Sequence, residues 1–120
     1  KGVKKVWKVG IEKPKSKGEK SAFEVISLKE GAIATSGDYR QFFEVDGVKY
    51  SHILNPKTGY PIQGDIVSVS VVGPNCSVAD GLATAMMVTG LKYSQSYFKK
   101  WVGYKIYMFS AENELIWVSE

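Results

Sequence analysis

The chain has 120 residues, of which 44% are hydrophobic and 23% are charged, with a net charge of +4. This composition is ordinary for a globular protein, and no apolar run approaches the roughly 20 residues that a membrane-spanning helix needs. The single cysteine, Cys76, excludes an intrachain disulfide and a multi-cysteine zinc site. We expect one domain over residues 1–120, with Cys76 as a small buried side chain.

The positive charge is concentrated at the start of the chain. Residues 1–20 carry eight lysines and two glutamates, a net charge of +6, and the remaining residues carry −2. Such a segment could bind nucleic acid or an anionic membrane, or it could be a lysine-rich edge strand followed by a solvated loop. The lysines are not interleaved with stacking aromatic residues, so we expect the strand and loop, and no nucleic-acid partner.

Alternating apolar and polar residues predict strands in the first half of the chain. The Glu30-Gly31 pair predicts a hairpin between two of these strands, and Asp46-Gly47 is the favoured pair for a type I′ hairpin turn. The last strand of this half is apolar on both faces, which predicts a central position in a sheet. The expected strands cover residues 4–12, 22–28, 32–35, the two runs flanking Asp46-Gly47 within 40–54, and 65–73.

The periodicity becomes helical after residue 76. Apolar residues at helical spacing predict a helix over residues 77–90 that ends at Gly90, and a second helix over residues 91–101. Two further strands are expected on either side of residues 111–114. Hairpin-connected strands with segregated helices predict an α+β fold, in which a helix pair packs on a largely antiparallel sheet.

A first polar cluster follows the run at residues 32–35. Ser36-Gly37-Asp38 ends a strand, and successive backbone N–H groups in such a turn form a nest that binds anions. The alternative is a turn that merely connects two strands. The cluster taken alone favours the simple turn.

A second cluster surrounds the only histidine of the chain. His52 stands six residues before Thr58, and Asn55-Pro56 starts a turn between them. The imidazole, the Lys57 ammonium and the Thr58 hydroxyl all suit a phosphate group. The alternative is a partly buried histidine bonded to the backbone, beside an ordinary turn threonine. Loops between rigid strands often carry binding residues, which favours the phosphate site.

A third cluster lies at the start of the predicted helix. Asp80 and Thr84 are four residues apart, so they share one helix face. A carboxylate and a hydroxyl form part of an oxygen-ligand set for Mg²⁺, which phosphate oxygens and water usually complete. The competing interpretation is a capping box from Ser77 to Asp80, with Thr84 bonded to the carbonyl one turn back.

These three clusters resemble, in the same order, the motifs of the ApbE family, the FAD:protein FMN transferases. The similar stretches are "TSGDY" at residues 35–39, "HILNPKTGYP" at 52–61 and "ADGLAT" at 79–84. The resemblance covers most of residues 2–120, and three collinear motifs make chance similarity improbable. The family's chain is much longer, and this sequence resembles only its C-terminal part. The resemblance therefore implies a partial domain with a T-fold-like architecture.

The resemblance implies Mg²⁺-dependent transfer of FMN from FAD to a Thr or Ser hydroxyl of an acceptor flavoprotein, with release of AMP. Alternatives are a Mg²⁺-dependent FAD pyrophosphatase that yields FMN and AMP, and a non-catalytic FAD-binding fragment. The implied acceptors are subunits of redox complexes of the Rnf and Nqr type. The implied location is extracytoplasmic, either periplasmic or as a membrane-anchored lipoprotein.

The resemblance also assigns roles to individual residues. Asp80 and Thr84 match the metal ligands, and His52 and Asp80 are the candidates for catalysis. The upstream region of the family, which contributes flavin contacts and a backbone carbonyl to the metal, is missing from this sequence. We therefore expect the missing N-terminal part or a second copy to complete the site. The positions that match FAD-binding residues are Ser36, Gly37, Tyr39, His52, Pro56 and Thr58.

Overall fold

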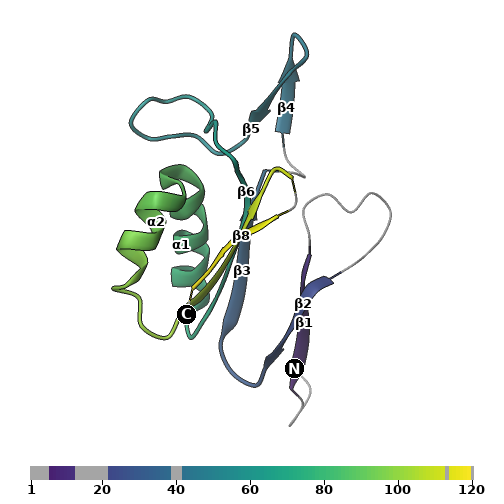
Figure 1. Cartoon of the computed structure of the whole chain (residues 1–120), viewed down its shortest axis with the longest axis vertical. Helices are drawn as coiled ribbons and strands as arrows, with labels where there is room; N and C mark the ends of the chain where they lie inside the picture. The colour runs from purple at the N-terminus through teal and green to yellow at the C-terminus, as the bar shows by residue number, and fades with distance from the viewer. Residues whose placement is uncertain (1–5, 13–21, 39–41, 113, 120) are drawn as a thin grey trace.

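The structure is a computed structural model that describes residues 6–12, 22–38, 42–112 and 114–119 (Figure 1). Strands precede and follow a pair of helices, which confirms the predicted α+β class. The elements are β1 (Trp7–Glu12), β2 (Ala22–Leu28), β3 (Ala32–Gly37), β4 (Phe42–Val45), β5 (Val48–Ser51), β6 (Ile66–Gly73), α1 (Cys76–Thr89), α2 (Leu91–Phe98), β7 (Lys105–Ser110) and β8 (Leu115–Val118).

A four-stranded antiparallel sheet forms the centre of the fold, in the order β3-β6-β7-β8. Both helices lie against one face of this sheet, and the β1–β2 ribbon lies against the other (Figure 1). The central strand β6 is therefore buried on both sides, as predicted, but the face away from the helices carries the buried Ser68 and Ser70 and is not wholly apolar. Its Val69 and Val71 side chains are fully buried beneath α1.

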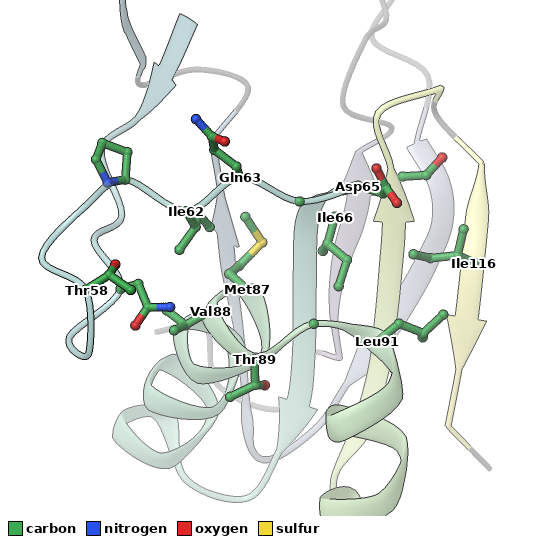
Figure 2. Close-up of a pocket in the computed structure, with 15 residues that line it drawn as sticks. Thr58, Ile62, Gln63, Asp65, Ile66, Met87, Val88, Thr89, Leu91 and Ile116 are labelled. Carbon is green, nitrogen blue, oxygen red and sulfur yellow. The ribbon is translucent and has the colours of Figure 1, made fainter.

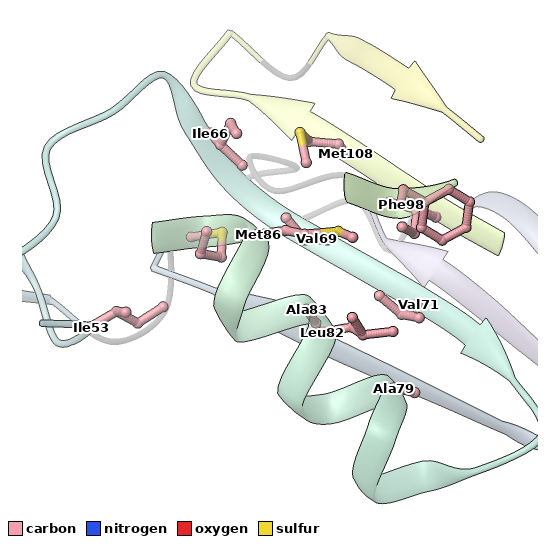
Figure 3. Packing of buried hydrophobic residues seen from close by; sticks show 12 residues of the cluster. Ile53, Ile66, Val69, Val71, Ala79, Leu82, Ala83, Met86, Phe98 and Met108 are labelled. Carbon is pink, nitrogen blue, oxygen red and sulfur yellow. The ribbon is translucent and has the colours of Figure 1, made fainter. Parts of the chain in front are cut away.

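The two faces of the sheet carry two separate cores. Along β7 the side chains alternate, so that Ile106 and Met108 join the core under the helices. Tyr107 and Phe109 point the opposite way and pack with Ile11 of β1. The helix-side core is the larger of the two and includes Ala79, Leu82, Ala83, Met86 and Met87 of α1 (Figure 3).

The predicted pairing of residues 22–28 with residues 32–35 is wrong. The turn itself is present, with Gly31 at a φ of 102°, but β2 pairs with β1 and β3 pairs with β6. Pairing with β6 buries one face of β3 under α1. A hairpin with β2 would not give β3 this apolar contact. Sequence periodicity identifies strands, but it does not identify their partners.

The other local predictions have mixed outcomes. The Asp46-Gly47 hairpin is confirmed, with both residues at positive φ between β4 and β5. The leading strand is confirmed as β1, whereas residues 1–5 and the lysine loop at 13–21 lie outside the described residues. Cys76 is exposed rather than buried, because it is the first residue of α1. None of the described helices has the length and apolarity needed to cross a membrane.

Candidate functional site

A hydrogen bond joins the end of β3 to the middle of α1. The Ser36 Oγ and Thr84 Oγ1 atoms are 2.7 Å apart, although 48 residues separate them in sequence. The contact is possible because Ala79 and Ala83, both fully buried, let α1 lie close to the sheet. The first and third polar clusters of the sequence therefore meet at one place.

The start of α1 decides between the two interpretations of Asp80. Asn75 is the N-cap, and its Oδ1 atom accepts hydrogen bonds from the Val78 N–H at 3.0 Å and the Ser77 hydroxyl at 2.8 Å. The competing interpretation, a capping box from Ser77 to Asp80, is therefore wrong, because Asn75 is the N-cap and the helix begins at Cys76. The same interpretation gave Thr84 a bond to the carbonyl one turn back, whereas its hydroxyl bonds that of Ser36.

Asp80 and Thr84 lie one turn apart on an exposed part of α1. Neither residue caps the helix, and the adjacent Gly81 leaves open space, because no neighbouring atom lies within 4 Å of the place where a methyl group on Gly81 would sit. A carboxylate and a hydroxyl are thus presented together to solvent beside Ser36. This arrangement can provide two oxygen donors to a hard cation.

The segment after Ser36 does not form an anion nest, which was the less favoured interpretation of this cluster taken alone. Gly37 continues the β3–β6 ladder opposite Ser68, and the Asp38 N–H donates to the Val67 carbonyl at 3.1 Å. On the other side of β6, the pairing with β7 has an irregularity between Ile66 and Ser68, at Val67. The remaining member of this motif, Tyr39, lies outside the described residues.

Asp38 is the candidate-site residue whose pKa departs clearly from its ordinary value. Partial burial raises the pKa of its carboxyl group, and its own backbone N–H and the nearby His52 imidazole act in the opposite direction. The carboxylate and the imidazole therefore share one electrostatic environment, although one follows β3 and the other follows β5. Sequence reasoning considered Asp38 only as part of a turn, and its pairing with His52 depends on long-range packing.

The loop after β5 is anchored beside α1 by Ile53. This side chain is 8% exposed and belongs to the same buried cluster as Met86 (Figure 3). Its backbone N–H donates to the Ser51 hydroxyl, and its carbonyl accepts from the Ile62 N–H. Because neighbouring side chains point in different directions, burial of Ile53 leaves His52 exposed at the site.

The tip of this loop is a tight turn held by Asn55. Its carbonyl accepts from the Thr58 and Gly59 N–H groups, and its side chain accepts from the Lys57 N–H at 2.9 Å. The Thr58 hydroxyl accepts from the Tyr60 N–H at 3.2 Å, so it takes part in the turn as the simpler interpretation stated. Its hydroxyl hydrogen is still available as a donor.

A cavity of about 470 Å³ lies next to Thr58, between the loop, the α1–α2 junction and the β7–β8 end of the sheet (Figure 2). Apolar side chains form most of its wall, and polar side chains such as Gln63 and Asp65 form the rest. The sequence did not indicate this cavity, because segments far apart in the chain form it. The residues that line it include Asn55, Thr58, Ile62, Gln63, Asp65, Ile66, Met87, Thr89, Leu91, Ser110 and Ile116.

The predicted residues therefore fall into two groups. Ser36, Thr84 and the exposed Asp80 gather at β3 and α1, and His52 lies within electrostatic range of Asp38 at the end of β3. Thr58 instead lines the cavity, which His52, Ser36 and Thr84 do not line. Pro56 is exposed in the turn that precedes Thr58.

The oxygen atoms of Asp80 and Thr84 provide only part of the coordination shell of Mg²⁺. Within the described ranges, no three His, Cys, Asp or Glu side chains are close enough to hold a metal ion by themselves. Mg²⁺ suits such a site, because it usually takes one or two protein carboxylates and completes its shell with phosphate oxygens and water. Asp80 and Thr84 are the residues that could hold it.

Comparison with known proteins decides the family. The model of the ApbE family matches residues 1–108. The chain belongs to the ApbE family. It is 55% identical over 84 residues to the FAD:protein FMN transferase of Vibrio cholerae serotype O1, an alignment that covers 70% of this chain and 25% of that relative. It is 37% identical over 113 residues to the corresponding transferase of Klebsiella pneumoniae, covering 94% and 32%.

Solved ApbE structures have the same fold. The ApbE protein from Thermotoga maritima superposes with a TM-score of 0.78 at 32% identity, covering 98% of this chain and 36% of that one. The flavin transferase ApbE from Vibrio cholerae superposes with a TM-score of 0.70 at 42% identity, covering 87% and 32%. The chain thus spans between a quarter and a third of the length of the curated relatives cited above.

The N-cap assignment makes a direct prediction about stability. Asn75→Ala should lower the free energy of unfolding by about 1 kcal/mol, because it removes the acceptor for the Val78 N–H. Asp80→Ala should change it by less than about 0.5 kcal/mol, because Asp80 is an exposed residue outside the cap. Urea unfolding of both variants measures the difference. A larger loss of unfolding free energy in Asp80→Ala than in Asn75→Ala would contradict this assignment and support the capping box instead.

The raised pKa of Asp38 predicts a pH-dependent effect of Asp38→Asn. A raised pKa in the folded state means that protonated Asp38 favours folding below its unfolded pKa, and that this contribution is lost as pH rises through the folded pKa. The stability of Asp38→Asn relative to the parent protein should therefore be greater at about pH 7 than at about pH 3. Unfolding curves of both proteins at the two pH values measure this difference. A difference that is equal or smaller at the higher pH contradicts the prediction.

Proposed function

We propose that this chain is the C-terminal part of an FAD:protein FMN transferase. The observation that carries the proposal is the bond between Ser36 and Thr84, which joins two ApbE motifs into one exposed group of oxygen donors. His52 of the second motif lies within electrostatic range of Asp38, which follows the end of β3. The relatives named FAD:protein FMN transferase support the reaction and FAD as its substrate.

The proposed reaction is a phosphoryl-type transfer. The hydroxyl oxygen of an acceptor Thr or Ser forms a bond to the FMN phosphorus of FAD, and the bond from that phosphorus to the bridging oxygen breaks. AMP leaves with the electron pair, and the hydroxyl proton goes to a base or to water. Such reactions depend mainly on positioning and on charge stabilisation by the protein.

His52 has two candidate roles in this reaction. Its imidazole can accept the proton of the acceptor hydroxyl, or it can donate a hydrogen bond to a phosphate oxygen. Asp38, which lies in the same electrostatic environment, would orient the ring in either case. Bound Mg²⁺ would neutralise pyrophosphate charge and stabilise the leaving group, with Asp80 and Thr84 as its ligands from this chain.

The cavity next to Thr58 supports a dinucleotide substrate. Its volume of about 470 Å³ and its apolar walls suit an aromatic ring system, with polar groups such as Gln63 and Asp65 at the edge. It adjoins the loop that carries His52, so one ring of FAD could occupy it while the pyrophosphate lies near α1.

The proposal extends to acceptors of the Rnf and Nqr type and to an extracytoplasmic location, which rest on the family resemblance.

The metal assignment predicts the effect of Asp80→Ala on activity. With FAD, Mg²⁺ and an acceptor protein, transfer should slow by about 100-fold or more, as expected when a group that stabilises transition-state charge is removed. Glu112→Ala is a matched control, since Glu112 is exposed and the hydrogen bond that it makes to Ser110 comes from its backbone N–H. Covalent flavin on the acceptor, measured by intact mass and fluorescence, reports transfer.

The products distinguish the proposed function from its alternatives. AMP together with free FMN, and no flavin on the acceptor, would identify a pyrophosphatase instead. FAD that binds but stays intact would identify a non-catalytic flavin-binding module. Full-rate transfer by Asp80→Ala would contradict the metal assignment while leaving the transferase activity in place.

A further inference from the structure

We propose that Ser36 is a positioning residue, which fixes the hydroxyl group of Thr84 in the orientation that a cation requires. This inference rests on the proposed function, because it concerns the same cation. The resemblance placed Ser36 among the FAD-binding positions, whereas the structure places its oxygen 2.7 Å from the oxygen of Thr84. Ser36 would thus act on the metal through another residue.

The hydrogen of the Thr84 hydroxyl needs an acceptor when the oxygen binds a cation. A threonine hydroxyl has one hydrogen and two lone pairs, and it binds a cation through a lone pair. Its hydrogen must then point away from the cation. The Ser36 oxygen is such an acceptor at hydrogen-bond distance. Either oxygen can be the donor in the absence of a cation, but a bound cation leaves Thr84 as the donor.

The structure also shows what Thr84 would do without Ser36. A threonine within a helix readily donates to the carbonyl one turn back, and Thr89 of the same helix does so with the Ala85 carbonyl at 2.9 Å. For Thr84 the corresponding carbonyl belongs to Asp80, the other candidate ligand. Removing Ser36 would free the Thr84 side chain to rotate toward this bond and away from the cation.

A second consequence concerns the substrate. Once Thr84 donates to Ser36, the hydrogen of the Ser36 hydroxyl is free to bond another acceptor, such as a phosphate oxygen of the nucleotide. Cation binding would then orient a donor for the nucleotide, and the two ligands would increase each other's affinity. Ser36 is only partly buried, so its hydroxyl can reach a ligand.

The adjacent residue offers a matched control. Thr35 Oγ1 is 2.7 Å from Ser70 Oγ, a bond of the same type and length made by the preceding residue of β3. Side chains alternate along a strand, so this bond lies on the opposite face of the sheet, away from α1. Thr35→Val removes a strand hydroxyl bond without touching Thr84.

The test measures Mn²⁺, an oxygen-seeking substitute for Mg²⁺, by the EPR signal of the free ion, with and without FAD. Ser36→Ala should weaken Mn²⁺ binding about 10- to 100-fold, the usual effect of removing a group that orients a ligand. Ser36→Thr should retain most of the affinity, and Thr35→Val should match the parent protein. The increase in FAD affinity caused by Mn²⁺ should also be smaller in Ser36→Ala.

The outcomes separate this inference from the proposed function. Normal Mn²⁺ affinity in Ser36→Ala, with loss of binding in Asp80→Ala, overturns the role of Ser36 and keeps the metal site. Equal losses in Ser36→Ala and Thr35→Val overturn it too, because they indicate a general weakening of β3. A parent protein that binds no Mn²⁺, with or without FAD, overturns the metal site and this inference together.

Discussion

The packing of α1 on β3 and β6 is the constraint on which the candidate site depends. Ala79 and Ala83 are fully buried against the sheet, and their small side chains bring the helix close enough for Thr84 to bond Ser36. The Asn75 cap fixes the residue at which the helix begins. A shift of one residue would rotate each side chain by about 100° around the helix axis, which would separate Asp80 and Thr84 from the strand end.

The remaining part of the site depends on the same core. Burial of Ile53 in the cluster under α1 fixes the loop after β5, and His52 is exposed beside it as a consequence. Apolar packing thus positions polar groups that have few structural roles of their own. This division is typical of sites in which rigid elements hold binding residues at their ends.

The elements could be predicted from sequence because their signals are local. Periodicity located β6 and α1, and the Asp46-Gly47 pair located the β4–β5 hairpin. The partner of β3 could not be predicted, since the Glu30-Gly31 turn favours pairing with its sequence neighbour β2, and the burial of β3 beside β6 and under α1 depends on the complete fold. The cap was also missed: only Ser77 was considered from the sequence, whereas Asn75, an equally good capping residue, caps the helix, and the choice depends on where β6 ends.

The central claim is that the ends of β3 and β5 and the exposed part of α1 form one metal and pyrophosphate site. Paramagnetic broadening of backbone NMR signals by Mn²⁺ in the presence of FAD tests this most directly. We predict that the signals of Ser36, His52 and Thr84 broaden together, while those of Val102 and Trp7 are unchanged. Broadening of Thr84 without Ser36 and His52, or strongest broadening around Val102, would contradict a shared site.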